Sequence, residues 1–223
     1  RESGNKRAAS LPPQLRQDLL WWLKVLPGWS GVEAISRVAA LSLPHETIAT
    51  DACNTGYGIL VRMPSAQPAA ASVPAQVAGE AKLDSNWRWV AETWSQDELA
   101  LAQREQKLAS SYLETVAATV AIEQFAGLFA GKRIRVLSDC AATVALLNAQ
   151  FSSNKPMAAL LRRVAAVAAE HRVSVVASHV AGVSNVLPDL LSRQRTSDFS
   201  HLSGLHSSSR IRLRSTLTPA SES

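Results

Sequence analysis

The sequence contains no long hydrophobic run and only two cysteines. No segment of the 223 residues approaches the roughly 18 consecutive apolar residues that a membrane-spanning helix requires. The basic start of the chain, residues 1–10, is not followed by the apolar stretch of a secretory signal. We therefore expect neither a membrane-spanning helix nor a secretory signal in this sequence.

The two cysteines, Cys53 and Cys140, are too few for a disulfide framework. Neither has a second Cys or a His at zinc-ligand spacing, so a zinc site is not expected. We expect both thiols to be reduced, in an intracellular protein of the cytoplasm or nucleus.

The composition is that of a globular and basic protein. Hydrophobic residues make up 47% of the chain, which is enough for a packed core. The net charge is +5 and the isoelectric point is about 9.6. A basic surface suits a polyanion such as nucleic acid, although a basic protein without such a partner has the same balance.

The hydrophobic pattern predicts a mixed α/β fold. A meander of strands at 47–51, 59–63 and 87–94 precedes a long helix at 103–129, and two further strands at 132–139 and 172–180 alternate with helices at 141–150, 156–171 and 185–193. A meander followed by crossovers of this kind implies a five-stranded mixed sheet flanked by helices.

We divide the chain into three parts. Residues 1–45 form an N-terminal connection with an amphipathic helix at 12–26, and residues 46–195 form the α/β domain. Residues 196–223 form a Ser-rich basic tail that we expect to be disordered or to be a linker to a further domain. Within the domain, residues 64–86 are rich in Ala, Pro and Ser and predict an exposed loop insertion. The chain begins without Met, and we expect it to be a piece of a larger protein.

Acidic residues occupy distinctive positions in these elements. Asp51 and Asp139 each end a predicted strand, whereas Glu114 and Asp189 lie on predicted helices. Carboxylates placed in this way can converge in the fold, and oxygen ligands are those that hard divalent cations prefer. The four acids therefore predict a metal site.

The sequence resembles the ribonuclease H domains of retroelements over residues 46–193. The segments that carry the resemblance are "TDACNTGYG", "SSYLE", "GKRIRVLSD" and, most specifically, "HVAGVSNVLPDLLSR". The upstream "LRQDLLWWLKVLPGWSG" is similar to the connection between reverse transcriptase and ribonuclease H in DIRS-like or related retrotransposon polyproteins.

This resemblance implies a ribonuclease H-like fold and an endonuclease that cleaves the RNA strand of RNA–DNA hybrids beside a reverse transcriptase domain. It implies two Mg²⁺ ions, or Mn²⁺, held by Asp51, Glu114, Asp139 and Asp189. His179, ten residues before Asp189, would assist product release or proton transfer.

The resemblance also suggests contacts to nucleic acid. Such contacts are expected from Asn54 and Gly56 in the first turn, from Ser110 and Ser111 before Glu114, and from Asn185, which is also a favoured helix N-cap residue.

Each site residue has a structural alternative. Asp51 suits an Asx-turn, Asp139 a helix N-cap, and Glu114 and Asp189 exposed helix positions, in which case Glu98 or Glu105 replaces Glu114 as a ligand; His179 suits a hydrogen bond to the backbone. At the level of function, the alternatives are an inactive nucleic-acid-binding module of the same fold and a DNA-directed nuclease.

Overall fold

The protein is described here from a computed structural model, which covers residues 11–28, 45–64, 77–80, 82–104 and 109–213. Its internal contacts divide the chain into two units, residues 1–39 and residues 40–223. The second unit contains the sheet and all the predicted site residues.

The sheet has five strands: β1 (His45–Ala52), β2 (Gly56–Arg62), β3 (Trp87–Thr93), β4 (Arg133–Ser138) and β5 (Ser174–His179). Their order across the sheet is β3-β2-β1-β4-β5. The first three strands pair antiparallel, and β4 pairs parallel with both β1 and β5. The predicted five-stranded mixed sheet is confirmed.

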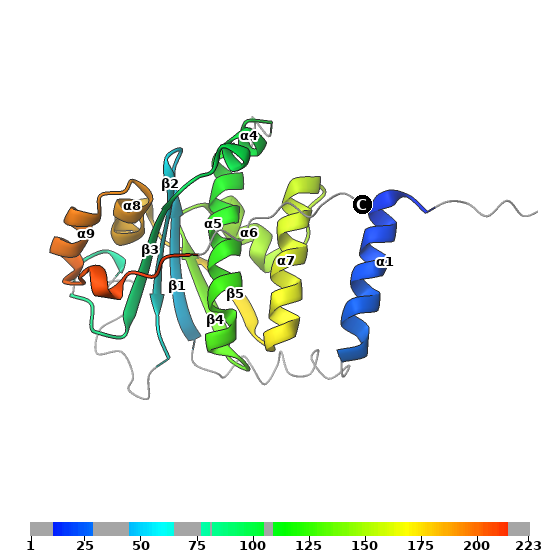
Figure 1. The fold of residues 1–223 in the computed structure, drawn as a ribbon, viewed down its shortest axis with the longest axis horizontal. Coiled ribbons are helices and arrows are strands. Elements are labelled where there is room, and N and C mark those ends of the chain that lie inside the picture. The colour runs from blue at the N-terminus through cyan, green and yellow to red at the C-terminus, as the bar shows by residue number, and fades with distance from the viewer. Residues whose placement is uncertain (1–10, 29–44, 65–76, 81, 105–108, 214–223) are drawn as a thin grey trace, which may run out of the picture. The chain divides into compact units, whose positions relative to one another are not determined.

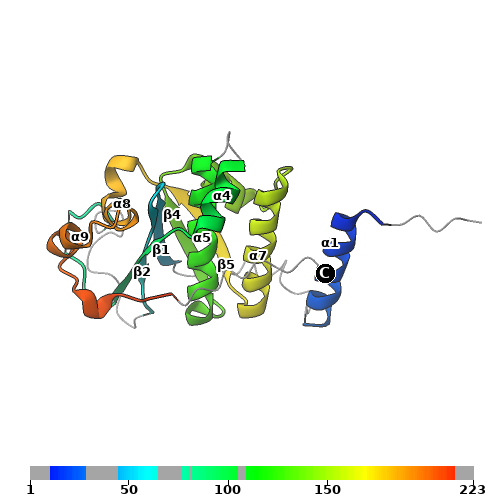
Figure 2. The same cartoon turned by 45° about the horizontal axis from the view of Figure 1, so that its top comes forward.

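Helices cover both faces of this sheet (Figures 1 and 2). One face carries α4 (Gln96–Arg104), α5 (Ala109–Phe125), α6 (Ala141–Ala149) and α7 (Lys155–His171), and the other carries α8 (Val186–Ser192) and α9 (Thr196–Ser203). The helix predicted at 103–129 is therefore divided: α4 ends at Arg104, α5 begins at Ala109, and a 3₁₀ turn follows α5 at Ala126–Phe129. Residues 105–108, with the alternative ligand Glu105, lie outside the described residues.

Strand residues alternate between two apolar layers, because successive side chains of a strand point to opposite faces. In β1, Ile48 packs in the layer with α5 and α7, whereas Ala49 packs in the layer with α8 and α9. By the same alternation Asp51 shares the face of Ala49. The sheet is thus buried on both sides, and Asp51 lies at one of its ends on the α8 side.

The approach of α8 to the sheet depends on Gly58 in β2. A Cβ atom at this position would lie 2.4 Å from the carbonyl oxygen of Pro188 and 2.6 Å from Cβ of Leu191. Real Cβ atoms do not come so close to backbone oxygen, so only glycine allows α8 to pack here. The glycine of the first hairpin therefore fixes the depth of a helix about 130 residues later in the chain.

The prediction of a disordered tail from residue 196 is wrong for the part that the structure describes. Phe199 of α9 is fully buried, with its ring 5.2 Å from that of Trp89, and Leu205 is buried in the same layer. Ile211 N donates to Trp89 O, so the chain continues along the outer edge of β3. The prediction relied on the many serines and did not consider the two apolar residues, Phe199 and Leu205, whose burial holds residues 196–213 on the domain. Residues 214–223 lie outside the described residues.

The second half of the predicted insertion at 64–86 is also packed rather than exposed. Val77 and Leu83 are buried beside α9, and Leu83 N donates to Ser203 O. Lys82 Nζ donates to the carbonyls of His201 and Leu202. This segment folds because α9 supplies its partners, and residues 65–76 and 81 lie outside the described residues.

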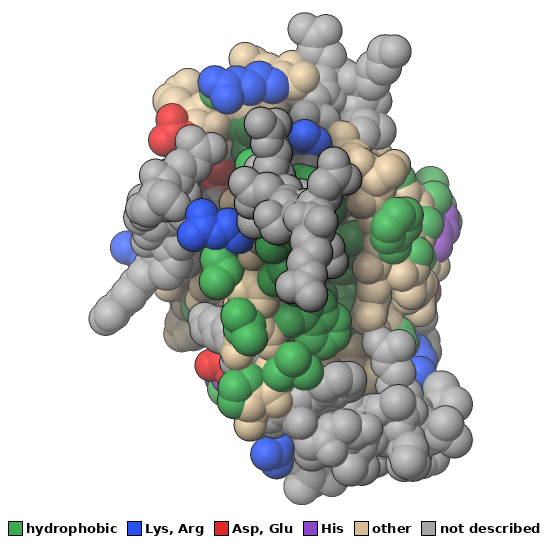
Figure 3. Space-filling model, turned by 90° about the vertical axis from the view of Figure 1, so that its right-hand side faces the viewer, with side chains coloured by type: hydrophobic (Ala, Val, Ile, Leu, Met, Phe, Trp, Pro, Cys, Tyr) green, Lys and Arg blue, Asp and Glu red, His purple; other side chains and the backbone are tan. Residues whose placement is uncertain are grey.

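In the N-terminal unit, helix α1 (Pro13–Val25) confirms the predicted amphipathic helix within a residue at each end. Its large apolar side chains are exposed within that unit: Leu15, Leu19, Leu20, Trp22 and Leu23. Figure 3 shows a group of hydrophobic side chains at the surface of the face that it draws.

Candidate metal centre

Three of the four predicted acids meet at one end of the sheet. Asp51 belongs to β1, and Asp139 directly follows β4, the parallel neighbour of β1, so both lie at the carboxyl ends of adjacent strands. Glu114 reaches the same end from α5 on the opposite face. One carboxylate oxygen from each residue lies within 4.8 Å of the other two.

Asp51 is held from two sides by α8. Ser192 Oγ donates a 2.5 Å hydrogen bond to Asp51 Oδ2, and Asn185 Nδ2 donates to Asp51 Oδ1 at 3.4 Å and to Thr50 O at 3.1 Å. Ser192 and Asn185 are both fully buried. They lie at the two ends of α8, so the helix fixes the orientation of this carboxylate.

Burial and neighbouring charges perturb Asp51. Removal from water, together with the negative charges of Asp139 and Asp189, raises its pKa from 3.8 to about 6. The hydrogen bond from Ser192 and the charge of Arg193 act in the opposite direction. The carboxylate therefore lacks sufficient positive charge nearby to compensate for its burial.

Glu114 is perturbed still more strongly. Its Oε1 accepts a 3.2 Å hydrogen bond from Ala52 N, but its buried Oε2 has no hydrogen-bond partner. Burial, and then the charge of Asp51, raise its pKa from 4.5 to about 9, although the bond from Ala52 N opposes this. A buried acid with an unpaired oxygen is unstable in its charged form unless a cation accompanies it.

The cluster fits a hard divalent cation. It offers oxygen ligands only, which Mg²⁺ and Mn²⁺ prefer, and it contains no thiol or imidazole ligand of the kind that selects zinc. A cation would pair with the free Oε2 of Glu114 and relieve the repulsion among the three carboxylates.

Asp189 lies beside this cluster rather than within it. It is in the first turn of α8, its side chain is 37% exposed, and Oδ1 accepts a 2.7 Å hydrogen bond from Arg193 Nε. Its charge still raises the pKa of Asp51, which shows that the two acids are neighbours. The structure thus brings together Asp51, Glu114 and Asp139 and keeps Asp189 paired with an arginine one turn away.

His179, at the end of β5, is exposed, and its Nε2 lies 3.0 Å from the carbonyl oxygen of Asp139. The backbone hydrogen bond expected as its structural alternative is therefore present. Gly182, in the loop that follows β5, also lies close to Asp139: a Cβ atom at this position would be 3.2 Å from Asp139 Oδ2. His179 therefore lies beside the cluster, in contact with the backbone of Asp139.

The residues predicted to contact nucleic acid fall into two groups. Asn54 and Ser110 are exposed, and Ser111 is half-buried. Ser110 and Ser111 precede Glu114 by four and three residues on α5, so they share its side of the helix. Gly56 and Asn185 are buried, and the side chain of Asn185 is directed to Asp51 and Thr50.

Two predictions about Asn185 are therefore corrected. It occupies the N-cap position of α8, but its side chain makes no capping hydrogen bond and instead holds the end of β1. With no exposed surface, that side chain cannot reach a nucleic acid outside the domain.

The five-stranded mixed sheet, the helices on its two faces and the acids at the ends of β1 and β4 agree with the fold that the resemblance implied. The fold is ribonuclease H-like. Among solved structures, this ribonuclease H-like chain is similar to the crystal structure of RNase H1 from the halophilic archaeon Halobacterium salinarum NRC-1, with 12% sequence identity and a TM-score of 0.44. The similarity covers 70% of this chain and 99% of the archaeal one. No family model matches the chain, and no curated protein matches it.

The contact of Ser192 with Asp51 was not predicted, although Ser192 lies in the segment "HVAGVSNVLPDLLSR" that carries the resemblance. Ser192 follows Asp189 by three residues, and its Oγ also donates to Asp189 O at 3.0 Å. The position of Ser192 three residues after Asp189 marked it as a possible site residue. Its contact with Asp51 depends on the packing of α8 against β1 and β2.

The remaining predictions concern cysteines and the membrane. Cys53 and Cys140 are both free thiols, so the pair forms no disulfide. Among the described residues, no helix has the length and apolar character needed to cross a bilayer.

Proposed function

We propose that this chain is an endonuclease that cleaves the RNA strand of RNA–DNA hybrids with two Mg²⁺ ions. The observation that carries the proposal is the group formed by Asp51, Glu114 and Asp139, whose oxygens lie within 4.8 Å of one another and whose buried members have raised pKa values. Such a cluster is costly to the protein unless cations bind there.

Each acid has a role in this proposal. Asp51, Glu114 and Asp139 would hold one ion, and Asp51 together with Asp189 would hold the second, for which Asp189 would have to release Arg193. Bound divalent ions supply a nucleophilic water and stabilise the leaving oxygen. Asn185 and Ser192 hold Asp51 in place during this exchange. His179, exposed beside Asp139, assists proton transfer or product release.

The choice of substrate follows from the surroundings of the cluster. The exposed Asn54 and Ser110 flank the acids on the β1–β2 turn and on α5, where a 2′-hydroxyl of the RNA strand would lie in the shallow minor groove. The backbone of Gly56 and the side chain of Ser111 complete this contact in our proposal. The net charge of +5 favours a polyanionic substrate around an acidic centre.

In the same proposal the chain is the ribonuclease H portion of a DIRS-like or related retrotransposon polyprotein, working with a reverse transcriptase domain inside the cell. The support is the sequence resemblance, above all the segment "HVAGVSNVLPDLLSR". Residues 1–45 would then form the connection to the polymerase.

The test is cleavage of a hybrid with separately labelled RNA and DNA strands, with Mg²⁺ or with chelator. The variant Asp139→Asn removes one ligand of the cluster. The matched control is Glu170→Gln, which neutralises an exposed acid near the C-terminal end of α7. We expect chelator-sensitive cutting of the RNA strand alone, lost in Asp139→Asn and retained in Glu170→Gln.

Other outcomes separate the alternatives. Hybrid binding without cutting at any metal concentration would contradict the proposal and favour an inactive module. Cutting of duplex DNA in preference to the hybrid would favour a DNA-directed nuclease.

A further inference from the structure

A second polar feature lies where α9 and the segment after it meet the outer strand β3. A cavity of about 690 Å³ opens there, with the buried indole of Trp89 in its lining. Four hydroxyl groups line it, from Thr196, Ser197, Ser200 and Ser207. Within the described part of the chain, none of these hydroxyls is engaged in a hydrogen bond.

The charged groups of the cavity are all basic. Arg210 and Arg212 line it together with His206, and its lining includes no carboxylate from the residues that the structure describes. Arg210 is fixed in place: its guanidinium carbon lies 5.3 Å from the Trp89 ring centroid, and Nη2 donates to Ala91 O at 2.5 Å. Hydroxyl groups beside guanidinium groups are the donors that bind phosphate.

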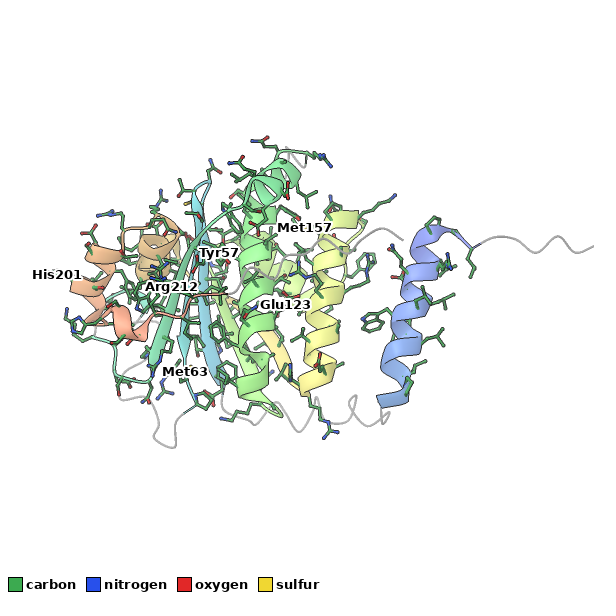
Figure 4. The ribbon with its side chains drawn as sticks, in the orientation of Figure 1. Tyr57, Met63, Glu123, Met157, His201 and Arg212 are labelled. Atoms are coloured by element: carbon green, nitrogen blue, oxygen red, sulfur yellow. The ribbon has the colours of Figure 1, made fainter. Side chains whose placement is uncertain are left out.

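Arg212 differs from Arg210 in being exposed and available. Among the described residues it forms no ion pair or hydrogen bond, whereas Arg210 lies 3.7 Å from Glu92 Oε1. Figure 4 shows Arg212 on the β3 side of the sheet. A negatively charged ligand in the cavity would therefore pair with Arg212 without displacing another acid.

The register of the sheet places this cavity close to the metal centre. Asp51 pairs with Gly58, and Gly58 pairs with Ala91, whose carbonyl oxygen holds Arg210. Two strand spacings separate Asp51 from Ala91, which is about 10 Å. Trp89, the β3 residue in the lining, lies two residues before Ala91, so the cavity is a few nucleotide spacings of a bound strand from the metal centre.

Basic side chains also occupy the path between the two sites. Arg193 and Arg195 follow Asp189 at the end of α8, and their side chains are 55% and 58% exposed. Arg195 directly precedes Thr196, which lines the cavity. Each of these arginines is ion-paired, Arg193 with Asp189 and Arg195 with Asp198, so among the described residues the uncompensated positive charge lies in the cavity itself, at Arg212.

We infer that this cavity binds the backbone phosphates of the substrate strand a few nucleotides from the bond at the metal centre. The inference concerns a binding site built by α9 and residues 206–212, and for its ligand it rests on the proposed function. Its contacts are to phosphate, so it adds affinity without base specificity.

The test uses equilibrium binding of a fluorescent RNA–DNA hybrid to the whole chain in chelator, where no cleavage occurs, at several salt concentrations. Arg212→Glu reverses the exposed charge of the cavity, and Ser200→Asp introduces a carboxylate into its wall. The control is Arg172→Glu, the same change of charge at an exposed residue that caps the far end of α7. Thermal unfolding establishes that each variant is folded.

We expect both cavity variants to weaken binding about tenfold or more, which is the size of one charge-assisted hydrogen bond. Arg212→Glu should also reduce the slope of log affinity against log salt by about one, because one phosphate contact is lost. Arg172→Glu should remain within about twofold of the native chain, since a distant surface charge is screened.

Equal weakening by Arg212→Glu and Arg172→Glu would overturn the inference, since net charge alone would then explain binding. An unchanged salt slope in Arg212→Glu would overturn it as well. Hybrid binding that depends on the cavity, in a chain that never cuts RNA with Mg²⁺, would refute the proposed nuclease and leave the phosphate site standing.

Discussion

The substitution Glu114→Gln tests the electrostatic origin of the metal centre. The pKa of Glu114 is about 9 in the folded chain, whereas the ordinary value for a glutamate is 4.5, so between these values the folded state binds a proton that the unfolded state has lost. Without divalent cations, the stabilising effect of that proton is complete below pH 4.5 and disappears as the pH rises towards 9. The native chain should therefore lose stability with increasing pH.

The expected size follows from one proton per molecule. One group contributes about 1.4 kcal/mol per pH unit, so from pH 6 to pH 8 the loss is about 3 kcal/mol. For a chain of this size that corresponds to a decrease of about 6–12 °C in the unfolding midpoint. Glu114→Gln keeps the acceptor for Ala52 N and places an amide beside the unpaired position of Oε2, and it removes the titration.

The assay is thermal unfolding of both proteins in chelator from pH 5.5 to 8.5, repeated with saturating Mg²⁺. We expect the variant to have a flatter profile in chelator and to exceed the native midpoint at pH 8, whereas Mg²⁺ should raise only the native midpoint substantially. Identical pH profiles for the two proteins, or a native midpoint that rises with pH in chelator, would refute the reasoning.

Three further substitutions test how α8 and α9 pack on the sheet. Ser192→Ala removes the hydrogen bond to Asp51 and should lower the free energy of unfolding by about 1–3 kcal/mol and shift Mg²⁺ binding to higher pH; denaturant titration and metal titration would measure this, and unchanged values would argue against the contact. Gly58→Ala places a methyl group 2.4 Å from Pro188 O and should displace α8, with a loss of about 1–3 kcal/mol and weaker Mg²⁺ binding, whereas native-like titrations would contradict the close approach. Phe199→Ala empties a fully buried site and should cost about 3–5 kcal/mol in urea unfolding; a loss below about 0.5 kcal/mol would support the disordered tail instead.

Strands and long helices were predictable because their signals are local. The alternation and apolar runs of 47–51 and 132–139 become β1 and β4, and the predicted helix at 156–171 becomes α7 with its start set by Asn154, whose side chain accepts from Met157 N. The division between α4 and α5 was not predicted, because Leu101 and Leu108 are seven residues apart, a spacing that fits one continuous helix.

Elements that depend on distant partners were not predictable in the same way. Residues 196–213 and the segment around Leu83 contain few apolar residues, and each becomes ordered because the other and Trp89 bury those few. A composition rich in Ser and Ala predicts disorder for the segment as a whole. Whether these segments are ordered depends instead on the burial of a few side chains such as Phe199.

The order of strands and helices, and the four acids at strand ends and on helices, were predictable from the amino-acid sequence alone, because periodicity and residue type are properties of neighbouring positions. Only the folded chain shows that oxygens of Asp51, Glu114 and Asp139 lie within 4.8 Å of one another while Asp189 pairs with Arg193. The fold also turned Asn185 and Ser192 towards Asp51 and formed a basic cavity beside β3. Charge, burial and hydrogen bonding act through space: Asp51 lies 63 residues before Glu114 and 141 residues before Ser192 in the chain, and only the packed sheet brings these residues together.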